Sequence, residues 1–347
     1  MDDSELEFTT MEEPEIPAIK TRGNRATLLA TRIGRLAGQL EAFRHSEDPL
    51  VEPWLQIMAS GEAIAGAWLS EWDVDSRSFF LFTLGDVRPK YETVGLNYAV
   101  ALRSASLQVL RTRRGAEDFP ALASRLRTTS AAALAESFML EWTRYESALE
   151  AEGLPAAAAL IAAWHRWEKE FYDRAAEEHE TLSMFPEKGM PGVVTRVAAP
   201  WAIRAALGGR FPALPFCAGI KGRGLEYRKA IVKGGEDWIL LFLDILLKNA
   251  TRAIEMRRNL ELVVEMTKRR SRSAHGRARK HDEAFAYFLA SQPVLDSESV
   301  MKALKLSGRG ALDVIARSEA SQIIRPLGER QRYKTWICDQ LAGVLDI

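Results

Sequence analysis

Three charged residues near the C-terminal end, Arg309, Asp313 and Arg317, are spaced four apart, so on a helix they share one face. An arginine can donate two hydrogen bonds to O6 and N7 of guanine, which makes Arg309 the best candidate for contact with a base in the major groove. Asp313 would repel phosphate, but it could orient Arg309 across one helical turn or accept a hydrogen bond from a cytosine amine. Ser307 stands where it can cap the N-terminus of this helix.

Basic residues surround this helix in the sequence. A predicted hairpin after it carries Arg325, Arg330, Arg332 and Lys334, and the last two are two residues apart, so on a strand they share one face. The segment before it carries seven bases and no acid: Lys268, Arg269, Arg270, Arg272, Arg277, Arg279 and Lys280. Phosphate contacts supply most of the non-specific affinity for nucleic acid, so we predict double-stranded DNA as the partner.

The elements expected to position these residues are three helices and a β-hairpin. The apolar spacing predicts a first helix over 281–290, a second that Ser297 caps, and a turn at 305–308 before the third, which should bury Ala311, Leu312 and Ile315. Residues 322–325 and 332–337 read as two strands around a Pro-Leu-Gly turn. Residues 281–347 therefore read as a winged helix-turn-helix, although such a unit can also serve only for protein contact.

The rest of the chain reads as mainly helical. Apolar residues recur at three and four over 25–43, and similar helical segments follow over 51–72, 94–112, 121–151 and 155–179. Glycines and prolines are dense between 184 and 235, and one long helix is expected over 237–271. We predict an acidic flexible arm over 1–22, a helical domain over 23–270, a basic linker over 271–280 and the DNA-binding domain over 281–347.

The composition narrows the class of protein. Lys and Arg (47) balance Asp and Glu (47), and the two cysteines and five histidines form no spacing that predicts a disulfide, a metal site or another cofactor site. No stretch is apolar enough for a membrane helix and the first twenty residues are acidic, so we expect a cytoplasmic, nucleoid-associated protein. Trp68 and Trp72 stand at helical spacing, which favours core packing over an aromatic ligand pocket.

The C-terminal residues resemble those of a known family. QPVLDSESVMKALKLSGRGALDVIA (292–316) followed by IIRPLGERQRYKTWI (323–337) is similar to the helix-turn-helix domain of a rhizobial, often plasmid-encoded family of unknown function, in which a helical domain precedes the DNA-binding module. The resemblance covers roughly the last sixty residues. It implies DNA binding, with residues 307–317 as the recognition helix.

The helical part resembles the Fic fold. EAIAGAWLSEW (62–72) is similar to the Fic inhibitory-helix region, and residues 214–250 are similar to the segment after the Fic active site. The Fic signature His-Pro-Phe-x-x-Gly-Asn-Gly-Arg is absent. Its best counterpart, residues 185–192 with Arg196 downstream, lacks the histidine base and the asparagine, while Ser70 and Glu71 replace the glutamate and glycine of the inhibitory helix.

Together these patterns predict a sequence-specific DNA-binding protein, a transcriptional regulator whose Fic-like helical domain is catalytically silent and which is not an enzyme. A homodimer would match a palindromic site. Two alternatives stay open: a Fic-type enzyme that transfers AMP to a protein target, and a non-enzymatic adaptor whose helical domain holds a partner.

Overall fold

The computed structural model describes residues 22–44, 47–85, 90–111, 129–177, 192–209, 214–275, 281–327, 334–338 and 340–341. Over these residues the chain is mainly helical, as predicted. The helices are α1 (Arg22–Arg44), α2 (Val51–Leu69), α3 (Ser76–Thr83), α4 (Lys90–Arg111), α6 (Thr129–Glu152), α7 (Leu154–Glu177), α8 (Val193–Ala206), α9 (Cys217–Ile220), α10 (Gly224–Lys233), α11 (Gly235–His275), α12 (Asp282–Ser291), α13 (Ser297–Leu304) and α14 (Gly308–Ala320). The strands are β1 (Val294–Asp296), β2 (Arg325–Pro326) and β3 (Thr335–Ile337).

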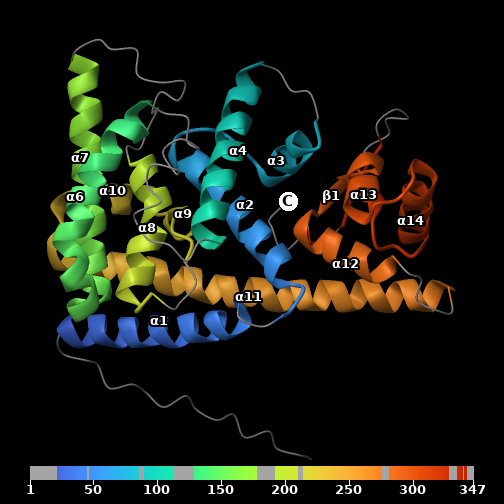
Figure 1. The fold of residues 1–347 in the computed structure, drawn as a ribbon, viewed down its shortest axis with the longest axis horizontal. Helices are drawn as coiled ribbons and strands as arrows, with labels where there is room; N and C mark the ends of the chain where they lie inside the picture. The colour runs from blue at the N-terminus through green and yellow to red at the C-terminus, as the bar shows by residue number, and fades with distance from the viewer. Residues whose placement is uncertain are drawn as a thin grey trace, which may run out of the picture.

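Helix α11 organises the fold. Its 41 residues extend for about 60 Å, and it passes beneath both the helical region and the C-terminal residues (Figure 1). Helix α1 lies along it, and its apolar stripe buries Ile33, Leu40 and Phe43. On α11 the matching buried positions include Phe242 and Leu246. This long amphipathic helix is the element that the apolar spacing predicted over 237–271.

Alanine-rich sequence lets the remaining helices pack closely. Helices α6 and α7 form a pair against which α8 packs, and three consecutive alanines of α7, at 156–158, are buried. Trp164 stacks on Phe138 of α6, with ring centroids 5.2 Å apart, and donates its indole N–H to the carbonyl of the same residue at 3.0 Å. A second close crossing joins α2 and α4.

The C-terminal unit comprises the described residues between 281 and 341. Its elements follow in the order α12, β1, α13, α14, β2 and β3, and its antiparallel sheet has the strand order β1-β3-β2. Ile337 of β3 pairs with Val294 on one side and with Arg325 on the other. Strand β1 was not predicted, because three residues are too few to show an alternating pattern.

The caps of the two central helices differ in how well they were predicted. Ser307 caps α14, as expected. Helix α13 is capped by Asp296 and not by Ser297: the Ser299 amide donates to Asp296 Oδ1 at 2.7 Å, and the Asp296 amide donates to Ser299 Oγ at 3.0 Å. Ser297 lies in the first turn because this reciprocal capping box moves the helix start by one residue.

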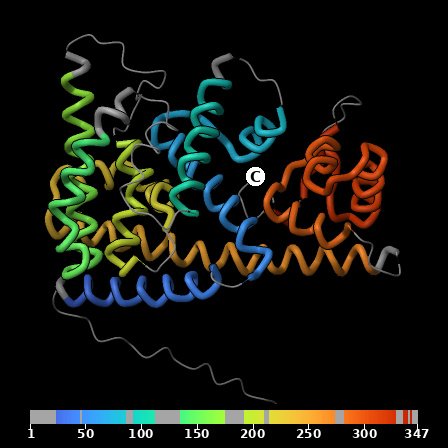
Figure 2. The backbone as a smooth tube through the Cα atoms, in the orientation of Figure 1, coloured from blue at the N-terminus to red at the C-terminus, as the bar shows by residue number. Residues whose placement is uncertain are grey.

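The C-terminal unit packs onto the helical region. Helix α12 contacts α11 and α2, and α3 contacts β1, so one hydrophobic core runs through both parts. Figure 2 shows the C-terminal unit lying over the C-terminal half of α11. Helix α11 continues to His275, so the first five residues of the expected linker over 271–280 are helical, and residues 276–280 lie outside the described part. Ser271 donates to Asp282 across this junction, at 2.6 Å.

The described residues contain no helix that is both long and apolar enough to cross a membrane. Cys217 and Cys338 are both buried thiols. In the same ranges of the chain, no group of three or more His, Cys, Asp or Glu side chains is placed to hold a metal ion. His179, one of the two histidines on the predicted helix over 155–179, lies outside these ranges.

Candidate nucleic-acid interface

Helix α14 is fixed at its N-terminus and along one face. Ser307 Oγ accepts a hydrogen bond from the Gly310 amide at 3.2 Å, which satisfies one of the amide groups that a helix start leaves unpaired. The helix buries Ala311, Val314 and Ile315 against the unit. Leu312 was expected to face inward, but it is 52% exposed because the inward stripe runs from 311 to 314 and 315.

The exposed face of α14 carries Arg309 and Asp313. Both side chains are exposed, and within the described residues neither makes an ion pair or a hydrogen bond. Asp313 therefore does not orient Arg309 across the helical turn in this structure. Lys305 lies just before the helix, in the turn that its left-handed backbone (φ 52°) makes after α13. The guanidinium of Arg309 is accessible to a ligand.

Arg317 does not share the outer face with the other two. Its guanidinium lies 3.7 Å from Asp282 Oδ1, and its side chain is 20% exposed. Asp282 is buried at the start of α12 and also accepts the hydrogen bond from Ser271. Arg317 therefore joins α14 to α12, whose Asp282 also contacts α11, and it holds the helix at one edge of the exposed face.

Two bases of α11 are also used inside the protein. Lys268 lies 3.1 Å from Glu283 and 3.4 Å from Glu265, and it hydrogen-bonds the Tyr287 hydroxyl at 3.2 Å. Burial opposes its charge, but the hydrogen bonds to Glu283 and Tyr287 outweigh burial and raise the pKa of Lys268. Arg270 donates to the Gln322 carbonyl at 2.7 Å, directly after α14. Both residues hold the C-terminal unit on α11.

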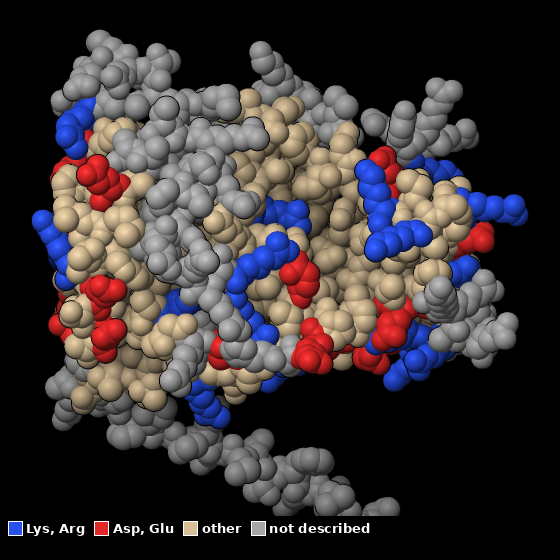
Figure 3. Space-filling view, in the orientation of Figure 1, with Lys and Arg blue, Asp and Glu red and all other residues tan. Residues whose placement is uncertain are grey.

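The other predicted phosphate contacts fall into two groups. Arg269, Arg272, Arg325 and Lys334 are exposed, the first two on α11 and the others at the β2–β3 end of the sheet. Five bases lie outside the described residues: Arg277, Arg279, Lys280, Arg330 and Arg332. Trp336 donates its indole N–H to Glu319 at 3.1 Å, which ties β3 to α14. The space-filling view shows Lys and Arg side chains reaching into solvent over the C-terminal unit, with acidic side chains between them (Figure 3).

The residues that relate to the Fic motif are deeply buried. Of residues 185–192, only Gly192 is described, and it precedes α8. Arg196 of α8 is fully buried and donates to Ser70 Oγ at 3.2 Å, while Ser70 Oγ and the Tyr98 hydroxyl lie 2.9 Å apart. This network is sealed among α2, α4 and α8.

The start of α8 is occupied by a carboxylate from the chain itself. Glu168 of α7, fully buried, accepts hydrogen bonds from the amides of Val194 and Thr195 at 2.9 and 2.8 Å and from the Thr195 hydroxyl at 2.7 Å. Burial raises the pKa of Glu168, and these hydrogen bonds oppose the change. The donors at this helix end, which could otherwise hold a phosphate, are taken.

His165 lies beside the same helix end. Burial, with the charges of Arg196 and Lys169, lowers its pKa to about 4, so its imidazole is neutral at pH 7. Its Nδ1 has no hydrogen-bond partner in the described part of the chain. A Cβ at Gly192 would lie 2.5 Å from that atom, so glycine is required there both by the contact and by a φ of 103°.

Comparison with known proteins gave no match, either to a protein-family model or to a curated protein sequence.

Proposed function

We propose that this protein binds double-stranded DNA through α14 of its C-terminal unit and acts as a transcriptional regulator. The observation that carries the proposal is the exposed Arg309 on a helix whose opposite side is buried in the unit and whose flank is tied to α12 by the Arg317–Asp282 ion pair. The guanidinium of Arg309 is available to a guanine because, within the described residues, it makes no hydrogen bond or ion pair. The helix that carries it is held in place by its buried side.

The arrangement of the unit supports a winged helix-turn-helix. A helix, a strand, two helices and two strands follow one another in the unit. In a winged helix-turn-helix the last two strands would be the wing that follows the recognition helix. In this proposal the exposed bases Arg325 and Lys334, in and next to these strands, and Arg269 and Arg272, on α11, contact phosphates of the duplex. Two copies on a palindromic site would double these contacts.

We also propose that the helical region has a Fic-like ancestry and is catalytically silent. The occupation of the α8 N-terminus by Glu168 supports this, because a nucleotide phosphate would have to displace a buried carboxylate with three hydrogen bonds. Transfer of label from ATP onto any protein by the full chain would contradict the proposal that the helical region has no catalytic activity.

Selection of duplexes from a random pool, followed by affinity measurement on the selected and a scrambled duplex, tests DNA binding. We expect Arg309→Ala to weaken binding to the selected duplex by about tenfold to a hundredfold and to leave the scrambled duplex much less affected. Arg166→Ala, an exposed arginine of α7, is the matched control and should change neither affinity. Failure to enrich any sequence would overturn the proposal, and so would equal affinity of the Arg309→Ala and Arg166→Ala variants for the selected duplex.

A further inference from the structure

A cleft of about 480 Å³ lies where α2, α3, α9 and α11 meet. This volume is in the range that small-molecule sites occupy. The apolar part of its lining comes from Ile57, Met58, Ile64, Phe80 and Met256. The cleft is separate from the exposed face of α14, so nothing in the proposed DNA contact uses it.

One wall of the cleft is cationic. It carries Lys221 after α9, and Lys248 and Arg252, which are one helical turn apart on α11. Within the described residues, none of the three makes an ion pair or a hydrogen bond to another side chain. Lys221 and Lys248 are exposed and Arg252 is half-buried, so the three positive charges lie at the mouth of the cleft, where they attract an anion from solvent.

The other polar groups of the lining are already engaged. Asp75 caps α3 by accepting a hydrogen bond from the Ser78 amide at 2.8 Å; burial opposes its charge, but the hydrogen bonds lower the pKa of Asp75. Asn249 donates to the Pro215 carbonyl at 2.6 Å. Asp75 keeps its negative charge, but the three cations outnumber it, so the net charge of the lining is positive.

A glycine in the middle of α2 keeps the cleft open. Gly61 lines the cleft, and a Cβ built on it would meet no atom within 4 Å. Gly66 of the same helix differs, because its Cβ would lie 3.0 Å from Leu102 Cδ1, so a larger residue there would push against Leu102. A glycine inside a helix costs about 1 kcal/mol relative to alanine, and at position 61 the described neighbours give no packing reason for that cost.

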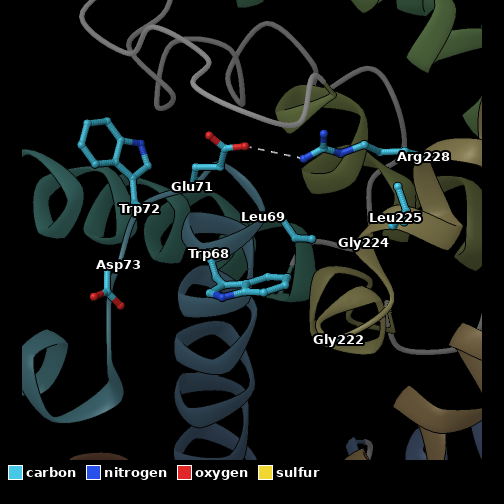
Figure 4. A pocket seen from close by; sticks show the side chains of 9 residues that line it. All are labelled: Trp68, Leu69, Glu71, Trp72, Asp73, Gly222, Gly224, Leu225 and Arg228. Carbon is cyan, nitrogen blue, oxygen red and sulfur yellow. Dashed lines mark ion pairs between the residues drawn. The ribbon is translucent and has the colours of Figure 1, made fainter.

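A second cleft, of about 620 Å³ (Figure 4), adjoins the first at Trp68, which is 43% exposed and lines both. In this second cleft Arg228 lies 3.7 Å from Glu71, so its cation already has an anionic partner. Trp68 is therefore not the core residue that its spacing predicted, and it adds an aromatic surface to the cationic cleft.

We infer that the cationic cleft binds a small molecule with an apolar body and one anionic head group. The apolar body fits beside Trp68 and Phe80, and the head group is attracted by Lys248, Arg252 and Lys221. A carboxylate, a sulfonate and a sulfate share this chemistry. The inference does not depend on DNA binding.

The probe for this site is 1-anilinonaphthalene-8-sulfonate, an aromatic sulfonate whose fluorescence rises in apolar surroundings, titrated into the full chain. N-phenyl-1-naphthylamine, which has the same apolar body without the sulfonate, is the uncharged comparison. Gly61→Leu should fill the cleft and lower the affinity for the sulfonate by at least about tenfold, since it removes the space that the apolar body needs. Its thermal stability should be equal to or above that of the wild type, because leucine favours the helix.

A second variant tests the positive charges of the cleft separately from its volume. Lys248→Gln together with Arg252→Gln should lower the affinity for the sulfonate by about tenfold and leave the affinity for the uncharged amine nearly unchanged. The matched controls are Gly34→Leu on α1, another helical glycine with no atom near its built Cβ, and Arg258→Gln, an exposed arginine of α11 outside the cleft. Neither control should alter binding. Sulfonate affinity that is unchanged in both Gly61→Leu and Lys248→Gln/Arg252→Gln would overturn the inference. An equal loss of affinity for both probes in the Lys248→Gln/Arg252→Gln variant would overturn it too.

Discussion

The N-termini of α8 and α14 show two opposite ways to complete the start of a helix. At α8, Glu168 brings a buried negative charge that satisfies two amides and a hydroxyl, and α9 uses Glu62 in the same way through the amides of Phe216, Cys217 and Ala218. At α14, an uncharged and exposed Ser307 satisfies one amide, and Arg309 stands beside it. A helix start attracts anions, but only the second of these two can still receive one from outside.

The largest effect should come from removing the internal anion of α8. Glu168→Ala leaves two amides and the Thr195 hydroxyl without their acceptor in a buried place, so we expect the free energy of unfolding to fall by about 3–5 kcal/mol. Urea denaturation measures it. Glu168→Gln retains an acceptor and should lose less. A loss below about 1 kcal/mol for the alanine variant would show that the carboxylate does not hold this helix end.

Acidification should weaken the same region through His165. Its pKa is lowered from 6.5 to about 4 in the folded protein, so the unfolded chain binds more protons in this interval. Stability therefore falls as the pH decreases from about 6.5 to about 4, by at most about 3 kcal/mol from this residue. Denaturation of the wild type and of His165→Phe across this range isolates the contribution of His165. The difference in stability between the two proteins should change with pH. A constant difference would show that His165 does not cause the pH dependence.

An aspartate at position 307 would give α14 a negatively charged cap, as Glu168 gives α8. Ser307→Asp should cap the helix as well as serine does, within about 0.5 kcal/mol, but its charge should lower the affinity for duplex DNA by about tenfold. Ser307→Asn, an uncharged cap of the same shape, is the control and should retain affinity. Equal affinity of the aspartate and asparagine variants would mean that no phosphate approaches this helix end.

The smallest effect concerns Asp313 on the exposed face. Asp313→Asn removes a negative charge that has no ionic partner within the described residues, so non-specific affinity for DNA should rise about twofold to threefold at low salt. Titration with a scrambled duplex measures this. If affinity for the selected duplex falls instead, Asp313 accepts a hydrogen bond from a base, as a cytosine amine would allow.

The helices could be predicted from the sequence because their apolar residues recur over many turns. The long α11, the pair α6 and α7 and the Ser307 cap all follow from this local pattern. The sequence did not show which basic residues pair with acids inside the protein and which remain exposed. Lys268 and Arg317 look like phosphate contacts in a charge count, but their partners Glu283 and Asp282 lie on α12. Only the tertiary packing of α12 beside α11 and α14 brings these pairs together.

The cationic cleft was missed for a similar reason. Lys248 and Arg252 are one turn apart in the sequence, but Lys221 and the apolar lining come from other elements. The local signal that could have pointed to it was Gly61, a glycine within an otherwise strong helical pattern. Sequence alone could not show whether that glycine served packing, as Gly66 does, or left a space.

Cleavage of DNA by a reagent tethered to α14 tests the central claim most directly. Both native cysteines are buried, so an iron chelate can be attached to Ala316→Cys on the exposed face of α14 and, as a control, to Glu146→Cys on the exposed side of α6. With the selected duplex bound, we predict cuts at a defined position from residue 316 and none from residue 146. A bound duplex that is left intact by the label at 316, or is cut equally from both positions, would contradict the account.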